Sequence, residues 1–335
     1  MPPRFFPELS KRFAQAIPRL EGRRVVVIGH ARPDGDCIGS QVAVARILAA
    51  HGIEVFCANG DPVPRRLAYL AAQHAFYNAD TLPPGDYAAV LVDCADLARI
   101  GPKLAARFPR PVLSFDHHLG ASHGAEENLV DTHAAATSEI IAGIAFDLDL
   151  PLDDVAAKAL YAGILTDTGQ FRHASTTARV FELVGRLIAC GAEPVEAGYH
   201  IYERESFGRM KLLQHFLSTL RLECGGRICV GILPLGIFDQ TGTGPEDTEG
   251  LVDYARAIDG VDIGVLLEER HGMTKGSLRA KDPALRMDRV AALFGGGGHA
   301  CAAGLNTKEP LSEVQPRLLA ALAETLARVD ALKSQ

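Results

Sequence analysis

The chain has 335 residues, which is long enough for two domains that each have a hydrophobic core. Its formal net charge is −7, from 34 basic and 41 acidic residues, and no dense run of Lys and Arg occurs, so long duplex nucleic acid is disfavoured as a ligand. No apolar run reaches about 18 residues, and the seven cysteines include no Cys-x-x-Cys pair, which argues against a membrane span, a disulfide framework and a thiolate zinc site.

The amino terminus carries Pro2, Pro3 and Pro7 and lacks the apolar core of a signal peptide. We therefore expect a cytoplasmic protein. A short anionic substrate is compatible with the negative net charge, because bound metal ions and a few arginines can hold a phosphate without an extended basic surface.

Short apolar strands alternate with helical patterns along the first part of the chain. Strands are predicted at 24–28, 54–58, 88–92 and 112–115, and a helix at 40–50. This rhythm predicts an α/β fold with a mostly parallel sheet, in a first domain that spans residues 1–192. Because ligands of parallel sheets bind at the carboxyl ends of the strands, polar side chains that follow a strand should meet at that edge.

The segment after the first strand places His30, Asp34 and Asp36 within seven residues. Pro33 and Gly35 interrupt regular structure there, so these side chains are expected on a loop between strand and helix. They would repel one another unless a cation neutralised them. A metal site is the simplest explanation of this motif.

Asp93 ends the third predicted strand. At such a junction an aspartate commonly caps the following helix, and Asp93 considered alone would be assigned that role. Beside the other acidic clusters a ligand that bridges two metal ions is favoured, and Asp96 becomes the better candidate for the cap.

Asp116, His117 and His118 follow the fourth predicted strand. Consecutive side chains cannot all point the same way, so one imidazole is expected as a metal ligand while the other faces the substrate. Asp116 could orient an imidazole by accepting its N–H. A single histidine would more often have a structural role, but two beside an aspartate favour catalysis.

Asp167 lies between Gly163 and Gly169, after a helical pattern, and is a further ligand candidate. In an isolated segment, a helix-terminal Asx turn would be the preferred interpretation. Arg172, which follows, is equally compatible with a phosphate contact and with an ion pair to a surface carboxylate.

Residues 193–218 show a polar helical pattern that we expect to connect two domains. Its apolar residues are spaced for a single helix face, and they are Tyr199, Tyr202, Phe207, Met210, Leu213 and Phe216. A second, smaller α/β domain is expected over residues 219–335, with strands at 220–223, 228–233 and 263–268 and a closing helix at 311–332.

A glycine-histidine loop in the second domain predicts an anion site. Gly296, Gly297 and Gly298 precede His299, and the small residues at 300–304 could open a helix. Successive backbone N–H groups without side chains form a concavity for phosphate, to which a helix N-terminus would add. A Walker lysine is absent, so a nucleotide P-loop is disfavoured.

Lys275 and Arg279 lie on a predicted strand near this loop. By itself this segment is equally compatible with a solvated edge strand, which basic residues often protect from further pairing.

Taken together, these motifs resemble those of the DHH–DHHA1 phosphoesterases, in particular the nano-RNase branch, which is described as bifunctional oligoribonuclease and pAp phosphatase. The resemblance spans nearly the whole chain. It is carried by residues 30–40, Asp93, Asp116 to His118, 166–169, 246–251, 275–279 and 296–304.

The resemblance implies a catalytic site with two Mn²⁺ ions, with Mg²⁺ or another divalent ion as an alternative. The implied ligands of one ion are His30, Asp34 and Asp93, and those of the other are Asp36, Asp93, His117 and Asp167. The implied catalytic residues are Asp93, Asp116, His117 and His118. The mixture of imidazole and carboxylate donors independently suits Mn²⁺ better than Mg²⁺.

The resemblance also implies a substrate held in a cleft between the two domains. The implied substrate-binding residues are Lys275, Arg279, Gly296, Gly297, Gly298 and His299. Arg172 is added to them as a candidate from its own segment. The expected substrates are short RNA oligonucleotides or small nucleotides such as 3′-phosphoadenosine 5′-phosphate (pAp). A homodimer is compatible with the apolar positions at 183–188, which are expected either in the core or at a dimer interface.

Two other functions stay open. Hydrolysis of linear or cyclic dinucleotides, such as pApA or cyclic di-AMP, would use the same metals. A catalytically silent nucleotide-binding module belongs to a different class, and it is disfavoured because all the implied metal ligands are present.

Overall fold

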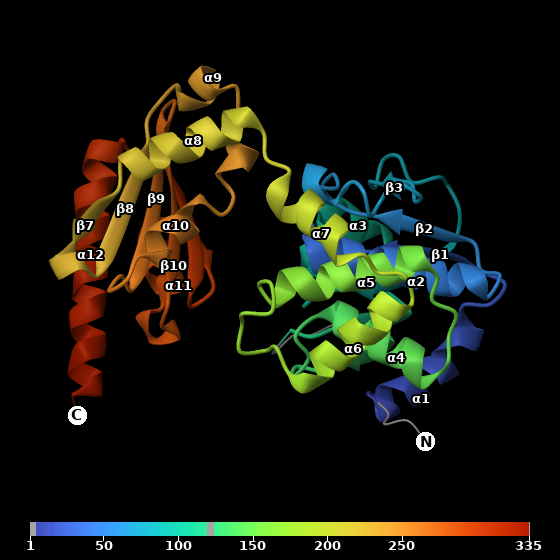
Figure 1. Cartoon of the computed structure of the whole chain (residues 1–335). Helices are drawn as coiled ribbons and strands as arrows, with labels where there is room; N and C mark the ends of the chain where they lie inside the picture. Colours follow the sequence, from blue (N-terminus) through green and yellow to red (C-terminus); the bar gives the residue numbers. More distant parts are fainter. Residues whose placement is uncertain (1–4, 119–123, 335) are drawn as a thin grey trace. The chain divides into compact units, whose positions relative to one another are not determined.

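The computed structural model describes residues 5–118 and 124–334. The chain forms two compact units, Met1–Arg204 and Glu205–Gln335 (Figure 1). Each unit contains a six-stranded sheet with helices packed against it, which confirms the predicted α/β fold. Pro2 and Pro3, on which the expectation about the amino terminus partly rests, lie outside the described residues.

The sheet of the first unit is parallel throughout. Its strands lie in the order β3-β2-β1-β4-β5-β6, and all neighbouring pairs run in the same direction. The strands are β1 (Arg24–Ile28), β2 (Val55–Ala58), β3 (Phe76–Tyr77), β4 (Tyr87–Val92), β5 (Leu113–Asp116) and β6 (Glu127–Val130). The strand order reverses between β1 and β4, which makes their carboxyl ends the expected ligand site of this sheet.

Both faces of this sheet are covered, which explains why β1 is uniformly apolar. Val25 and Val27 pack against helices of one face, and Val26 and Ile28 pack against the other. Burial of each such side chain stabilises the fold by roughly 1.5–3 kcal/mol. The helices of the unit are α1 (Pro7–Ala16), α2 (Gly35–Ala50), α3 (Pro102–Arg107), α4 (Thr137–Asp147), α5 (Asp154–Asp167), α6 (Ala178–Ala189) and α7 (Pro194–Gly198).

Helices α2 and α5 approach each other closely because each has a glycine where they cross. A Cβ at Gly39 would collide with the backbone oxygen of Ala159 in α5, and one at Gly163 would collide with the side chains of Asp36 in α2 and Ser138 in α4. The close packing brings the first turn of α2 near the last turn of α5. These two turns carry Asp36 and Asp167.

The second unit contains a mixed sheet in the order β11-β12-β10-β9-β8-β7. Among the described strands of this sheet, β8 and β9 form the one parallel pair, and the other neighbouring pairs are antiparallel. Helices α11 (Met287–Ala292) and α12 (Leu311–Lys333) contribute to the core on one face, and α8 (Phe207–Ser218) and α10 (Leu251–Ala257) contribute to the core on the other.

The strands of the second unit are β7 (Arg221–Glu223), β8 (Ile228–Leu233), β9 (Ile263–Arg270), β10 (Met273–Ala280), β11 (Gly297–Gly298) and β12 (Ala302–Thr307). Its helices are α8 (Phe207–Ser218), α9 (Ile237–Thr241), α10 (Leu251–Ala257), α11 (Met287–Ala292) and α12 (Leu311–Lys333).

The single apolar helix face expected over residues 193–218 is wrong. Helix α7 continues into a π-helical turn, Tyr199–Glu203, and three non-helical residues then precede α8. Phe216 is fully buried, whereas Phe207 is 77% exposed and Met210 is 49% exposed. The predicted helix is therefore interrupted, and within α8 itself Phe207 and Met210 do not share the buried face of Phe216.

The helix expected after the glycine-histidine loop is also wrong. Residues 302–307 form β12, and Gly297–Gly298 form the short strand β11 that pairs with it. A Cβ at Gly296 would collide with the backbone oxygen of Gly304. Glycine is therefore required at this position for close strand packing, and no helix N-terminus contributes to this loop.

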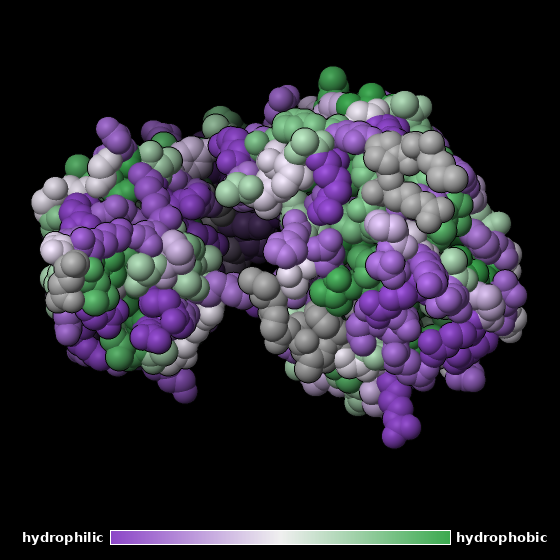
Figure 2. All heavy atoms as spheres, turned by 90° about the horizontal axis from the view of Figure 1, so that it is seen from below, coloured by the Kyte–Doolittle hydropathy of each residue, from purple (hydrophilic) through white to green (hydrophobic). Residues whose placement is uncertain are grey.

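The segment at 183–188 belongs mainly to the core of the first unit. Leu183, Val184 and Leu187 are buried there, while Ile188 is 45% exposed. On the face shown in Figure 2, hydrophilic side chains are interspersed with scattered apolar ones. Within the described ranges, no helix combines the length and apolar character needed to cross a bilayer.

Candidate metal centre

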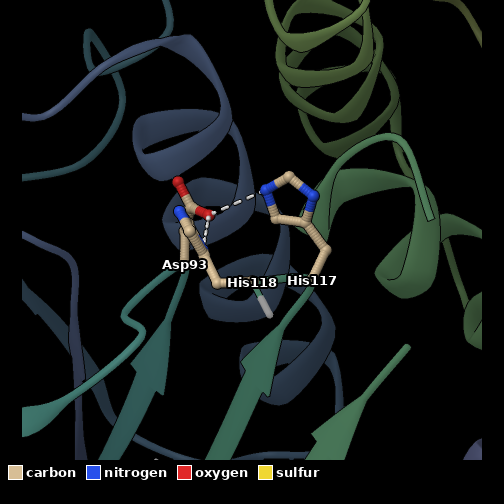
Figure 3. A group of neighbouring side chains, drawn as sticks. All are labelled: Asp93, His117 and His118. Atoms are coloured by element: carbon tan, nitrogen blue, oxygen red, sulfur yellow. Dashed lines mark ion pairs between the residues drawn. The ribbon is translucent and has the colours of Figure 1, made fainter. Parts of the chain in front are cut away.

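Three neighbouring strands of the first sheet deliver polar side chains to its carboxyl edge. His30 follows β1 after one glycine, Asp93 directly follows β4, and His117 and His118 follow β5. Figure 3 shows the carboxylate of Asp93 facing both imidazoles at the ends of β4 and β5. The convergence predicted from the positions of these residues is therefore present.

A first group of donors comprises His30, Asp34 and Asp93, whose ligand atoms lie within 4.8 Å of one another. His30 Nε2 is 3.6 Å from Asp34 Oδ1 and 3.4 Å from Asp93 Oδ2. The other ring nitrogen, Nδ1, lies 2.8 Å from the backbone oxygen of Ala31, which accepts its proton. In the neutral ring, Nε2 is therefore the nitrogen whose lone pair can bind a metal ion.

A second group comprises Asp36, His117 and Asp167. His117 Nε2 is 3.4 Å from Asp167 Oδ2 and 3.5 Å from Asp93 Oδ1. One oxygen of Asp93 therefore faces His30 and the other faces His117. This geometry places Asp93 between the two groups of donors.

The backbone of Asp93 is unusual, because its φ angle of 57° lies in the left-handed region. Non-glycine residues seldom adopt this conformation and are enriched at functional sites when they do. The Asp93 N–H donates to the backbone oxygen of Phe115 at 3.0 Å, so the β5 strand holds the turn in place. Asp96, the alternative helix cap, does cap the next 3₁₀ turn by accepting from the N–H of Arg99.

Asp36 is fully buried and lies in the first turn of α2, where the sequence predicted a loop. Asp34 is the N-cap of this helix and accepts from the N–H of Cys37 at 3.1 Å. The Asp36 carboxylate accepts from the backbone N–H groups of Thr137, at 2.6 Å, and Ser138, at 2.8 Å. Asp36 thus satisfies the free N–H groups at the start of α4, and the positive end of that helix stabilises its charge.

Thr137 also contacts Asp93, since its hydroxyl donates to Asp93 Oδ1 at 3.1 Å. Sequence reasoning missed Thr137 and Ser138. The available indication was a Thr-Ser pair at the start of an apolar run, which is typical of a helix N-terminus but says nothing about metal ligands.

His118 lies between a carboxylate and a guanidinium. Its Nδ1 is 2.7 Å from Asp116 Oδ1, and its Nε2 is 3.2 Å from Arg99 Nη1. A guanidinium can only donate, so in this arrangement Nε2 accepts and Nδ1 donates to Asp116. The hydrogen bond to Asp116 raises the pKa of His118, while burial and the charge of Arg99 act in the opposite direction. Arg99 was not identified from the sequence.

Burial and mutual repulsion dominate the electrostatics of the acidic residues. Burial, and next the charge of Asp93, raise the pKa of Asp36 to about 7. Burial and the charges of Asp36 and Asp93 likewise raise the pKa of Asp167. Burial also disfavours ionisation of Asp34, but the contact with His30 lowers its pKa overall.

These donors fit divalent cations. The groups combine buried carboxylates whose charges repel one another with imidazoles whose Nε2 atoms face the same space. Cations would remove the repulsion and keep the carboxylates ionised. His30, Asp34 and Asp93 could hold one cation, and Asp36, Asp93, His117 and Asp167 could hold another.

Arg172 is engaged within its own loop. Its Nε donates to the backbone oxygen of Gly169 at 2.8 Å, and the residue is exposed. Among the described residues, no carboxylate forms an ion pair with Arg172, so the surface ion pair considered from the sequence is not formed. A substrate contact of Arg172 stays a prediction.

Lys275 and Arg279 lie in the interior of the second sheet, because β10 pairs with both β9 and β12. The solvated edge strand considered as an alternative is therefore wrong. Lys275 Nζ is 2.9 Å from Oε1 of the buried Glu268, an ion pair that lacks hydrogen-bond geometry. Lys275 consequently has a structural partner already.

Arg279 shares a half-exposed face of β10 with Lys275, while the intervening Leu278 is buried in the core. In the adjacent loop, Gly297 and Gly298 are exposed and the His299 N–H donates to the backbone oxygen of Ala302 at 2.7 Å. The loop therefore closes a tight hairpin. Its role as a phosphate site stays a prediction.

Comparisons with known proteins agree with this arrangement of two domains. Residues 24–164 match the DHH family N-terminal domain, and residues 225–328 match the DHHA1 domain. The chain is 30% identical over 328 residues to the bifunctional oligoribonuclease and PAP phosphatase NrnA of Thermus thermophilus, covering 97% of each protein.

Two solved structures resemble the whole chain. An exopolyphosphatase-related protein from Bacteroides fragilis has a TM-score of 0.85 at 22% identity, with 98% of each chain covered. RecJ from Thermus thermophilus in complex with Mn²⁺ has a TM-score of 0.52 at 18% identity, with 98% of this chain and 56% of that chain covered. At these identities the resemblance establishes the fold.

Proposed function

This chain belongs to the DHH family of phosphoesterases, with a DHHA1 second domain, and on that premise we propose that it hydrolyses very short oligoribonucleotides to 5′-mononucleotides. Dephosphorylation of pAp is a proposed second activity. The observation that carries the proposal is the position of Asp93, whose two carboxylate oxygens face two separate groups of metal-binding side chains. The name of the Thermus thermophilus relative supports the choice of substrate.

The proposed cofactor is a pair of divalent ions, and Mn²⁺ is the first candidate. Imidazole and carboxylate together suit Mn²⁺ better than the all-oxygen surroundings that Mg²⁺ prefers. The RecJ structure that resembles this chain was determined with Mn²⁺. When bound, such ions supply an acidified water at neutral pH and neutralise the oxygens of a reacting phosphoryl group.

The side chains of this protein would then orient the reactants. His118 is proposed to contact the phosphoryl group, because its ring borders the donors around Asp93 and is oriented by Asp116. Asp36 and Asp93 are held by hydrogen bonds from Thr137, which limits their freedom to turn away from a cation. A side-chain nucleophile is unnecessary in this proposal.

In the second unit, Arg279 and the loop from Gly296 to His299 are proposed to bind substrate. The support is their chemistry, since a guanidinium and exposed backbone N–H groups both suit a phosphate. Lys275 is a weaker candidate than the sequence suggested, because it already pairs with Glu268.

A substrate panel tests the proposal. Initial rates would be measured with Mn²⁺ on pApA, a five-residue RNA, pAp and cyclic di-AMP, for the wild type and for Asp93→Asn. We expect turnover of pApA and the short RNA, release of 5′-mononucleotides, and loss of both activities in the variant.

Other outcomes of the panel would contradict the proposal in different ways. Turnover of cyclic di-AMP alone would make the protein a cyclic dinucleotide phosphodiesterase. Binding of these nucleotides without turnover by the metal-loaded wild type would indicate a silent binding module.

A further inference from the structure

We propose that Arg99 binds the reacting phosphate at the metal centre, with its guanidinium donating hydrogen bonds to the phosphoryl oxygens. The inference rests on the proposed function, because it assigns Arg99 a role in the hydrolysis of a phosphate ester. It adds a cationic group to a site that is otherwise composed of carboxylates and imidazoles.

Arg99 is adjacent to the group proposed to meet the substrate. Its Nη1 lies 3.2 Å from His118 Nε2, on the side of the ring opposite the contact with Asp116. His118 Nδ1 is in turn 3.7 Å from Asp93 Oδ1. The guanidinium therefore lies at the edge of the metal centre, one imidazole ring away from Asp93.

The backbone of Arg99 is held on two sides. Its N–H donates to the side chain of Asp96 at 3.2 Å, in the 3₁₀ turn Leu97–Ile100 that follows β4. Its carbonyl accepts from the N–H of Ala31 at 2.7 Å, next to the candidate ligand His30. Arg99 is thereby tied to the loops after β1 and β4, and a group fixed in this way is suited to catalysis.

The charge of Arg99 is not neutralised by an acidic partner. Within the part of the chain that the structure describes, His118 is the sole hydrogen-bond partner of its side chain, and no carboxylate forms an ion pair with it. Two other arginines of this unit do have acidic partners. Arg46 pairs with Asp153, and Arg179 pairs with Glu139.

The unused donors of Arg99 match a phosphoryl group. A guanidinium carries five N–H donors in a planar fork that fits two phosphate oxygens, and Nη1 uses one of them toward His118. The charges of the four aspartates in the two donor groups balance those of two divalent ions. The negative charge of a substrate phosphate therefore needs a further cationic partner. Arg99 supplies that partner at a fixed position.

The test uses three variants of the full-length protein. Arg99→Met removes the positive charge and the planar set of N–H donors, while Arg99→Lys keeps the charge but not the planar donors. Arg110→Met is the matched control, because Arg110 is an exposed residue of the same unit. For each protein, kcat and KM would be measured on pApA with Mn²⁺. Titration calorimetry would give the affinity of the chelator-treated protein for Mn²⁺ and of the Mn²⁺-loaded protein for inorganic phosphate.

We expect Arg99→Met to lower kcat by about 10²- to 10³-fold, the range found when a donor to developing negative charge is removed. Its affinity for inorganic phosphate should fall about tenfold, as expected when a charged hydrogen bond is lost, while its affinity for Mn²⁺ changes less than about twofold. Arg99→Lys should recover part of both losses. Arg110→Met should match the wild type.

Two results would overturn the proposal. One is an Arg99→Met enzyme whose kcat and phosphate affinity both match those of the wild type. The other is a fall in Mn²⁺ affinity as large as the fall in kcat, which would assign Arg99 to the construction of the metal site.

The calorimetry separates this inference from the proposed function. If the wild type hydrolyses no phosphate ester, the proposed function fails, and phosphate binding still decides the role of Arg99. Weaker binding by Arg99→Met than by the wild type then supports that role. Equal binding by both proteins, or binding by neither, excludes it.

Discussion

The hydroxyl of Thr137 donates a hydrogen bond to Asp93 Oδ1 at 3.1 Å. The N–H of the same threonine donates to Asp36 Oδ2 at 2.6 Å. One residue at the start of α4 therefore fixes two carboxylates that belong to different elements of the metal centre. All three residues are buried, so solvent cannot replace these hydrogen bonds.

Replacement of Thr137 by valine should weaken the metal centre without changing the fold. The substitution removes the hydroxyl but preserves the shape of the side chain and the N–H that binds Asp36. We expect Mn²⁺ affinity or kcat to fall by about 10- to 100-fold, the usual effect of losing a group that orients a metal ligand. Calorimetry and initial rates on pApA measure the two quantities.

Thr137→Ser is the control for this variant, because it retains the hydroxyl. Its Mn²⁺ affinity and kcat should stay close to those of the wild type. If the valine and serine variants behave alike, the hydrogen bond to Asp93 has no role in holding the site.

The convergence of the acidic and imidazole side chains could be predicted from the sequence. Each of the segments before His30, Asp93 and His117 is apolar, which indicates a buried strand. In a parallel sheet the carboxyl ends of all strands lie at the same edge. The predicted sheet was therefore sufficient to bring these residues together. The assignment of each residue to a particular metal ion stays a prediction.

The supporting residues could not be predicted, because their contacts are distant in the sequence. Thr137 binds an acid 101 positions away, and Arg99 contacts an imidazole 19 positions away. No local pattern encodes such pairings. The prediction of a helix after His299 was wrong for a related reason. The small residues of this segment are compatible with a helix, and only their pairing with β10 and β11 makes the segment a strand.

The close approach of α2 and α5 predicts that Gly39→Ala is destabilising. The added Cβ would collide with the backbone oxygen of Ala159, which cannot rotate away. We expect a loss of about 1–3 kcal/mol in the free energy of unfolding, as is typical of overpacking. Weaker Mn²⁺ binding should accompany it, because the crossing holds Asp36 near Asp167.

Gly185→Ala in α6 is the matched substitution, since a Cβ at this position meets no atom within 4 Å. It should stabilise the protein by up to about 1 kcal/mol, because alanine favours the helix more than glycine does. Urea denaturation measures both variants. A Gly39→Ala protein as stable as the wild type would show that the helices can separate at no cost.

Asp153 should contribute a stability that depends on pH. It caps α5 by accepting from the N–H of Ala156 at 2.9 Å, and it accepts from Arg46 Nε at 2.7 Å. Burial acts to raise the pKa of Asp153, but the hydrogen bonds from Arg46 and Ala156 lower it below its ordinary value. Because the pKa is lower in the folded state, the stabilisation is present above about pH 4 and is lost as the pH falls further.

Asp153→Ala should therefore lower the melting temperature at pH 7 by about 2–4 °C, which corresponds to roughly 1 kcal/mol for a cap residue. The difference from the wild type should shrink from pH 7 toward about pH 3, because the Asp153 carboxylate takes up a proton as the pH falls through its lowered folded-state pKa. Glu21→Gln, a change at an exposed position, should show no such dependence. A difference that is equally large at both pH values would contradict the assignment.

The proposed hydrolysis requires Asp93 to lie between two cations. A crystal of the protein grown with Mn²⁺ and measured at the manganese absorption edge would locate these ions. We predict two anomalous peaks in the first unit that share Asp93, one bordered by His30 and Asp34 and the other by His117 and Asp167. A single peak, or peaks that Asp93 does not touch, would show that Asp93 does not bridge a pair of ions.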